Sequence, residues 1–172
     1  MTMVNMWTGG MAYDVDGEGF DPAVSKITRG GVDVSQDVSV RTSLLSALLC
    51  SNTTLSKVKD PECGEGKWEP KGNSSEAPLL VAAREVGFSE DTRSKYPRAL
   101  EIPLSPSRKT MHTITDMSGR SELCDGGMRF QVDTKYLTVV KGAPNFIVGF
   151  CSQQLTQDGR YERLDEAGKA QV

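Results

Sequence analysis

The stretch KYLTVVKGAPNF, residues 135–146, begins as a strand and ends at a lysine, a glycine and a proline. Its first half carries the apolar and β-branched side chains that a buried strand uses. Gly142 permits close approach of backbone, and Pro144 suits the first position of a helix. The stretch predicts either an ordinary strand, turn and helix, or a strand whose terminal Lys141 lies at the back of an anion-binding pocket.

The hydrophobic pattern of the rest of the chain predicts further strands, helices and loops around this strand. Further strands are predicted at 3–8, 11–15, 99–105, 110–115 and 129–133, helices at 35–52, 74–87, 90–96 and 144–155, and polar loops at 16–31 and 52–73. The strands 99–141 follow one another without intervening helices, which is typical of antiparallel pairing. The order therefore predicts an α+β fold, a twisted antiparallel β-sheet flanked by helices.

The length and composition fit one globular domain. The chain has 172 residues, 37% of them hydrophobic and 25% charged, and a net charge of −3. This charge and the absence of a long basic run disfavour nucleic acid as a partner. No apolar stretch approaches the roughly 20 residues that cross a bilayer. We therefore expect a soluble, monomeric fragment that makes no membrane contact of its own.

Motifs for metal binding and for common nucleotide folds are absent from the sequence. The four cysteines, Cys50, Cys63, Cys124 and Cys151, are irregularly spaced, and His112 is the single histidine. This pattern disfavours a zinc site, so no metal ligands are expected. Neither GxxxxGK[ST] nor GxGxxG nor GxSxG occurs. A reducing, cytosolic setting suits four unpaired thiols.

Three segments carry charge where elements begin or end. Glu76 lies in the first turn of a predicted helix, where it can equally be a carboxylate that favours the helix dipole. Arg108 and Lys109 lie between two predicted strands, as in a solvated hairpin. Lys141 ends the strand described above. Two lysines and one acid on rigid elements would suit an anionic ligand that also carries an amino group.

These segments, with one more, resemble the nucleotide-binding domain of type II P-type cation-transporting ATPases, in the branch of the sodium/potassium and calcium pumps. That family carries, in order, a Cys-Asn helix end, a Gly-x-x-[ST]-Glu-x-[AP]-Leu helix start, a Phe-x-x-x-x-Lys turn and Lys-Gly-Ala-Pro. The matching segments here are LLCSNTTL (48–55), GNSSEAPLL (72–80), IPLSPSRKTM (102–111) and VVKGAPNFI (139–147). The resemblance covers nearly the whole chain.

The resemblance implies a site for ATP. Glu76 would accept a hydrogen bond from the adenine amino group, Lys109 would line the site, and Lys141 would lie deep in it near the adenosine. Gly142 would let the base approach the backbone, with Ala143 beside it. Leu104 stands where the family has a phenylalanine that stacks on adenine, which costs roughly 0.5 to 1.5 kcal/mol of stacking energy.

The family's phosphorylated aspartate, in an Asp-Lys-Thr-Gly-Thr loop, is absent, so no catalytic residue is expected here. The resemblance implies that residues 1–172 are a single nucleotide-binding domain excised from a larger membrane pump, at the cytoplasmic face of a membrane. Its partners would be ATP, with Mg²⁺ on the phosphates, and the phosphorylation and actuator domains. Alone, it would bind ATP without hydrolysing it. Sodium, potassium, calcium and proton all remain open as the transported cation.

A second function remains open from the residues. The chain can also be a non-catalytic, soluble protein-interaction module that binds no nucleotide. Trp68, in the predicted loop 52–73, favours this alternative because an exposed tryptophan can anchor an interface. A tryptophan folded back on the core would remove that argument.

Overall fold

The computed structural model describes residues 2–59, 66–120, 122–125, 128–131 and 134–170. Its strands are β1 (Asn5–Thr8), β2 (Met11–Asp16), β3 (Lys26–Arg29), β4 (Val32–Asp33), β5 (Thr54–Lys59), β6 (Gly66–Lys71), β7 (Arg98–Ile102), β8 (Thr110–Asp116), β9 (Glu122–Asp125), β10 (Met128–Gln131), β11 (Tyr136–Gly142), β12 (Gln153–Leu155) and β13 (Tyr161–Arg163). Its helices are the 3-10 turn η1 (Pro22–Val24) and α1 (Val38–Leu49), α2 (Ala77–Glu85), α3 (Glu90–Lys95), α4 (Pro144–Phe150) and α5 (Glu166–Lys169).

The first strands form a four-stranded antiparallel sheet in the order β1-β2-β3-β4. β1 and β2 form the hairpin that the sequence predicts, and Gly9 and Gly10 turn the chain at positive φ. The segment 16–31 is mostly loop, as predicted, but it also contains β3, which the sequence did not predict. Ile27 pairs with Val15 of β2 and is completely buried. The polar residues around Ile27 give no strand pattern in the sequence, so this strand forms because of its tertiary contacts.

A second antiparallel sheet, in the order β11-β8-β7, carries the strands predicted at 99–105, 110–115 and 135–141, whereas the strand predicted at 129–133 corresponds to β10, which pairs with β9 in a separate hairpin. β8 is its central strand, and β11 pairs with β8 so that Lys141 faces Met111 and Gly142 faces Thr110. β11 leads into α4 within two residues, as the sequence predicts. This junction brings the end of β11 beside the turn that precedes β8.

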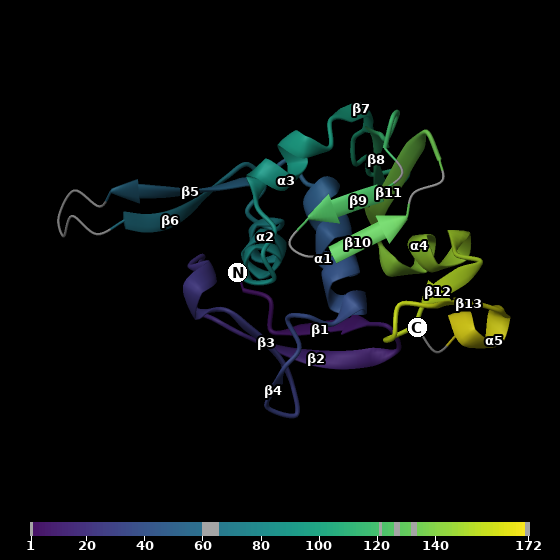
Figure 1. Ribbon diagram of the computed structural model, residues 1–172, viewed down its shortest axis with the longest axis horizontal. Coiled ribbons are helices and arrows are strands. Elements are labelled where there is room, and N and C mark those ends of the chain that lie inside the picture. Colours follow the sequence, from purple (N-terminus) through teal and green to yellow (C-terminus); the bar gives the residue numbers. More distant parts are fainter. Residues whose placement is uncertain (1, 60–65, 121, 126–127, 132–133, 171–172) are drawn as a thin grey trace.

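The segment 52–73 is not the predicted loop, because β5 and β6 pair across it as a hairpin. Figure 1 shows this hairpin extending away from the body of the molecule. Leu55, at the base of β5, is buried, while Lys57 and Lys59 on the same face are exposed because this part of the hairpin extends beyond the body of the molecule (Figure 1). The helix predicted over 144–155 is also too long, since α4 ends at Phe150 and β12 and β13 pair as a hairpin.

The helices α1 and α2 pack against each other, and α1 lies between the two larger sheets (Figure 1). Large side chains that are almost completely buried fill this region, among them Tyr13, Ile27, Leu44, Leu48, Leu80 and Phe88. All described strand pairs are antiparallel. The α+β prediction is therefore confirmed, although the described strands form two larger sheets and three hairpins rather than one sheet.

Across the described part of the chain, no helix combines the length and the apolar character that crossing a membrane requires.

Candidate functional site

The end of β11 and the start of α2 meet through a charged pair. Glu76 is the residue immediately before α2, and Lys141 is the penultimate residue of β11. The Lys141 Nζ donates a hydrogen bond to Glu76 Oε1, and the two groups form an ion pair. The side chains are only 26% and 13% exposed, so the pair is shielded from much of the solvent. The structure thus brings together two of the residues that the sequence singled out.

The chain between α1 and β5 supplies the donors to the other oxygen of Glu76. Oε2 accepts from Ser51 Oγ at 2.7 Å, from the Asn52 amide at 3.1 Å, and from the Thr53 amide and hydroxyl at 3.3 and 3.0 Å. Hydrogen bonds to an ionised group are stronger than those between neutral groups. The carboxylate is therefore fixed between this linker, which we call the 51–53 linker, and β11.

These contacts decide the ionisation of Glu76. Burial of the group raises the pKa of its carboxyl, but the hydrogen bonds from Lys141 and Ser51, the Lys141 charge and the Thr53 hydroxyl outweigh burial and lower the pKa to about 2. The carboxylate is consequently charged at neutral pH and acts only as a hydrogen-bond acceptor.

Lys109 lies in the turn before β8 and touches the Lys-Gly-Ala-Pro segment through its backbone. The Ala143 amide donates to the Lys109 carbonyl at 3.1 Å, and the Lys109 amide donates to the Ser105 carbonyl at 2.8 Å. Lys109 has a φ of 54°, a left-handed conformation that is uncommon for a residue with a side chain. The turn is therefore shaped to bring Lys109 against the end of β11.

The close approach of backbone atoms explains why position 142 is a glycine, and this approach cannot be read from the sequence. A Cβ at this position would overlap the Lys109 carbonyl oxygen and would lie 3.0 Å from Thr110 Cα. Both obstacles are backbone atoms, which cannot move aside as a side-chain tip can. Glycine is thus required here for the contact between β11 and the Lys109 turn, whether or not a ligand approaches.

Two apolar side chains lie near this end of the sheet. The Lys109 Nζ is 5.5 Å from the centroid of the Phe146 ring, which is within cation–π range, and Phe146 is 36% exposed. Leu104, between β7 and β8, is 61% exposed and takes no part in the contacts described above. The structure therefore gathers Glu76 and Lys141 in one contact, and Lys109, Gly142 and Ala143 in another directly beside it.

Sequence reasoning missed the hydroxyl donors Ser51 and Thr53 and the ring of Phe146. The linker motif that contains Ser51 and Thr53 was identified, but only through Cys50 and Asn52. A pair of hydroxyl residues directly after a helix is a weak signal, because the same pattern caps many helices and turns. Their role becomes visible only when α2 places Glu76 opposite them.

The cysteines that the structure describes are not arranged as metal ligands. Cys50 is completely buried beneath β8 and β11, and its thiol lies 3.7 Å from the carbonyls of Met111 and Val139. Cys63 and the side chain of Cys124 lie outside the described residues. Within the described residues, no group of three His, Cys, Asp or Glu side chains is arranged to hold a metal ion.

Trp68 is folded back on the body of the molecule. It lies on β6, is half-buried, and packs against the core, with the Arg84 guanidinium 4.7 Å from its ring centroid. A tryptophan that is already in contact with an α2 side chain does not have the exposed form of an interface anchor. The feature that favoured the interaction module is thus accounted for by packing.

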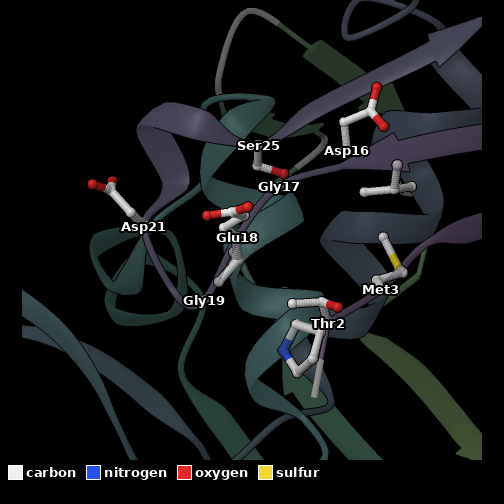
Figure 2. Close-up of a pocket in the computed structure, with 11 residues that line it drawn as sticks. Thr2, Met3, Asp16, Gly17, Glu18, Gly19, Asp21 and Ser25 are labelled. Atoms are coloured by element: carbon white, nitrogen blue, oxygen red, sulfur yellow. The ribbon is translucent and has the colours of Figure 1, made fainter.

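Figure 2 shows a separate hollow beside the N-terminal sheet, lined in part by Met3, Glu18 and Ser25. Its volume of about 20 Å³ is enough for a single water molecule, and Asp16, Glu18 and Asp21 make its rim acidic. Neither the size nor the charge suits a nucleotide. Of these two places, the end of β11 is the one that carries the cations Lys109 and Lys141, which a large anion needs.

The chain is similar to cation-transporting ATPases. Residues 39–172 match the family described as "P-type ATPase, cytoplasmic domain N". A calcium-transporting ATPase of Bacillus subtilis is 27% identical over 174 residues, which cover 100% of this chain and 17% of the relative. The P-type sodium-transporting ATPase4 of Toxoplasma gondii is 34% identical over 125 residues, 63% of this chain and 9% of the relative.

Another relative is the sodium/potassium-transporting ATPase subunit alpha-1 of Oreochromis mossambicus, 32% identical over 104 residues, 60% of this chain. The chain spans 17% or less of the length of these relatives.

Proposed function

This chain belongs to the family of P-type ATPase cytoplasmic N domains, and from that premise we propose that it binds ATP for a type II cation pump. The observation that carries the proposal is the ion pair of Glu76 and Lys141, beside Lys109, at the end of β11. The ionised carboxylate can accept from an amino group, and the two ammonium groups can hold a polyanion. An ATP molecule presents both an amino group and a polyanion.

The adenine amino group would bind Glu76 Oε1. Among the described contacts this oxygen accepts one hydrogen bond, from Lys141, whereas Oε2 accepts four. A carboxylate oxygen has two lone pairs, so Oε1 can accept a second donor while Lys141 stays in place. Lys141 would then lie close to the adenosine.

The other candidate residues would complete the site around the base and phosphates. Leu104 is exposed and can cover an adenine face by dispersion, without the stacking energy of an aromatic ring. Lys109 would add charge near the nucleotide, and Gly142 and Ala143 would offer backbone beside it. Mg²⁺ would be coordinated by the phosphates of ATP, because the described residues supply no acidic cluster for it.

In the whole pump the domain would act by positioning. It would hold ATP so that the γ-phosphate reaches the aspartate of a separate phosphorylation domain, and transfer would benefit from the high effective concentration of a bound donor. The actuator domain and the membrane segments of the parent chain would couple this reaction to cation transport. The 172-residue domain itself would bind ATP and leave it intact.

Isothermal titration calorimetry with Mg-free ATP tests this function. We expect weak binding, with a Kd of roughly 0.1 to 10 mM, because part of the site would belong to another domain. Lys141→Met is expected to weaken binding, and Lys169→Met is the control because Lys169 pairs with the exposed Glu166 on α5. Thermal unfolding of each variant verifies that it is folded. Equal affinity of Lys141→Met and wild type, or no binding by wild type, would refute the proposal.

A further inference from the structure

The 51–53 linker is bound from a second side by two arginines. Arg93 of α3 donates to the Ser51 carbonyl at 2.6 Å and to the Thr53 carbonyl at 2.9 Å. Arg98 of β7 donates to the Leu49 carbonyl at 2.8 Å and to the Ser51 carbonyl at 3.1 Å. The carbonyl groups at the end of α1 and along the linker are thus satisfied by guanidinium groups.

One peptide group lies between the two sets of charges. The Ser51 carbonyl and the Asn52 amide belong to the same peptide unit. Its oxygen accepts from both arginines, and its N–H donates to the Glu76 carboxylate. Hydrogen bonds at the two ends of a peptide unit polarise it and strengthen each other. A flip of this peptide would break all three bonds, so the arginines fix the orientation in which it serves Glu76.

A third charge fixes Arg98. The Glu101 carboxylate accepts from Arg98 at 2.6 Å through one oxygen and from the Asn52 side-chain amide at 2.7 Å through the other. Asn52 also accepts a hydrogen bond from Arg98. Because Arg98 and Glu101 both lie on β7, this triangle ties the linker to the same sheet that carries Lys141.

We propose that Arg93 and Arg98 are positioning residues for nucleotide recognition, which set the place of the Glu76 carboxylate by orienting the Ser51–Asn52 peptide. This inference rests on the proposed ATP site. Neither arginine needs to touch the nucleotide. Their effect is selective for the base, because adenine offers an amino donor where guanine offers a carbonyl acceptor. A correctly placed carboxylate therefore favours ATP over GTP, and a displaced one loses that preference.

The test compares Arg93→Met and Arg98→Met with Arg160→Met in the 172-residue chain. Methionine keeps much of the side-chain length and removes every donor. Arg160 is the control because its guanidinium is exposed and pairs only with Asp158 among the described ion pairs. Proton NMR follows the Asn52 amide without nucleotide, and calorimetry measures the affinities for ATP and for GTP.

Both linker variants are expected to move the Asn52 amide resonance upfield and to speed its hydrogen exchange. They are expected to weaken ATP binding about three- to tenfold, since the lost contact is worth about one hydrogen bond. GTP binding is expected to change less, so the ratio of the two affinities falls. General loosening of the fold would instead lower both affinities together.

An unchanged Asn52 amide in both variants would overturn the positioning role, and an unchanged ATP-to-GTP ratio would overturn the role in base selection. If either methionine variant fails to fold, Arg98→Lys replaces it. A lysine keeps the charge but cannot span two carbonyl groups, so an intermediate shift of the Asn52 amide is expected. If wild type binds neither nucleotide, the proposed function and base selection both fail, while the Asn52 resonance still decides the positioning role.

Discussion

Lys141 on β11 donates a hydrogen bond to Glu76 at the start of α2, a contact that joins residues 65 positions apart in the sequence. It connects the three-stranded sheet to the helical layer at one point. Because Glu76 also binds the 51–53 linker, three segments converge on a single carboxylate.

Glu76 is expected to make the fold sensitive to acid. Its carboxyl has a pKa of about 2 in the folded chain and an ordinary value of 4.5. The unfolded state therefore binds more protons between these values, and the stabilisation from this group is complete above about pH 4.5 and is lost as the pH falls through about 2. In Glu76→Gln, this part of the pH dependence should be absent.

Urea denaturation between pH 2.5 and pH 6 measures this effect as the free energy of unfolding. Glu166→Gln is the control, because the Glu166 side chain is 91% exposed. The interpretation would be wrong if wild type and Glu76→Gln lost stability in parallel over this range.

Gly142→Ala is expected to destabilise the protein by about 1–3 kcal/mol, because the added methyl group meets the backbone of Lys109 and Thr110. Gly149→Ala is the matched control. A Cβ at position 149, within α4, meets nothing within 4 Å. Alanine in a helix is more favourable than glycine by roughly 0.5–1 kcal/mol, so this control should be slightly stabilised. Equal stability of the two variants in thermal unfolding would contradict the packing assigned to Gly142.

Leu104→Phe is expected to tighten ATP binding by up to about tenfold, through an aromatic stacking energy of roughly 0.5 to 1.5 kcal/mol. Val32→Phe on β4 is the control, since Val32 is 66% exposed and lies in the other sheet. Calorimetry with ATP on both variants separates a local effect from added surface hydrophobicity. An affinity of Leu104→Phe equal to that of wild type would remove Leu104 from the proposed site.

Local signals were sufficient to predict much of the fold. The strand 135–141 is apolar and β-branched and ends at glycine and proline, and the helix 74–87 has a proline in its first turn and a glycine after its end. β11 forms over nearly the predicted residues, and α2 forms within the predicted range but is shorter at both ends. The hairpin of β5 and β6 could not be predicted from its polar sequence. Leu55 is buried and Trp68 contacts Arg84 because distant parts of the chain pack against this hairpin.

The same division applies to the site. Glu76 and Lys141 were identified from motifs, and the structure joins them. The donors on the 51–53 linker, and the overlap that requires Gly142, depend on which segments meet in space. The sequence alone does not show which residues of a linker, a helix start and a turn come into contact.

Amide chemical shifts during a titration of the ¹⁵N-labelled chain with Mg-free ATP test the central claim most directly. We predict that the amides of Glu76, Lys109 and Lys141 shift together and saturate at one Kd, while those of Asp21 and Trp68 stay in place. Shifts confined to Asp21 and Trp68, or no shifts at millimolar ATP, would contradict a nucleotide site at the end of β11.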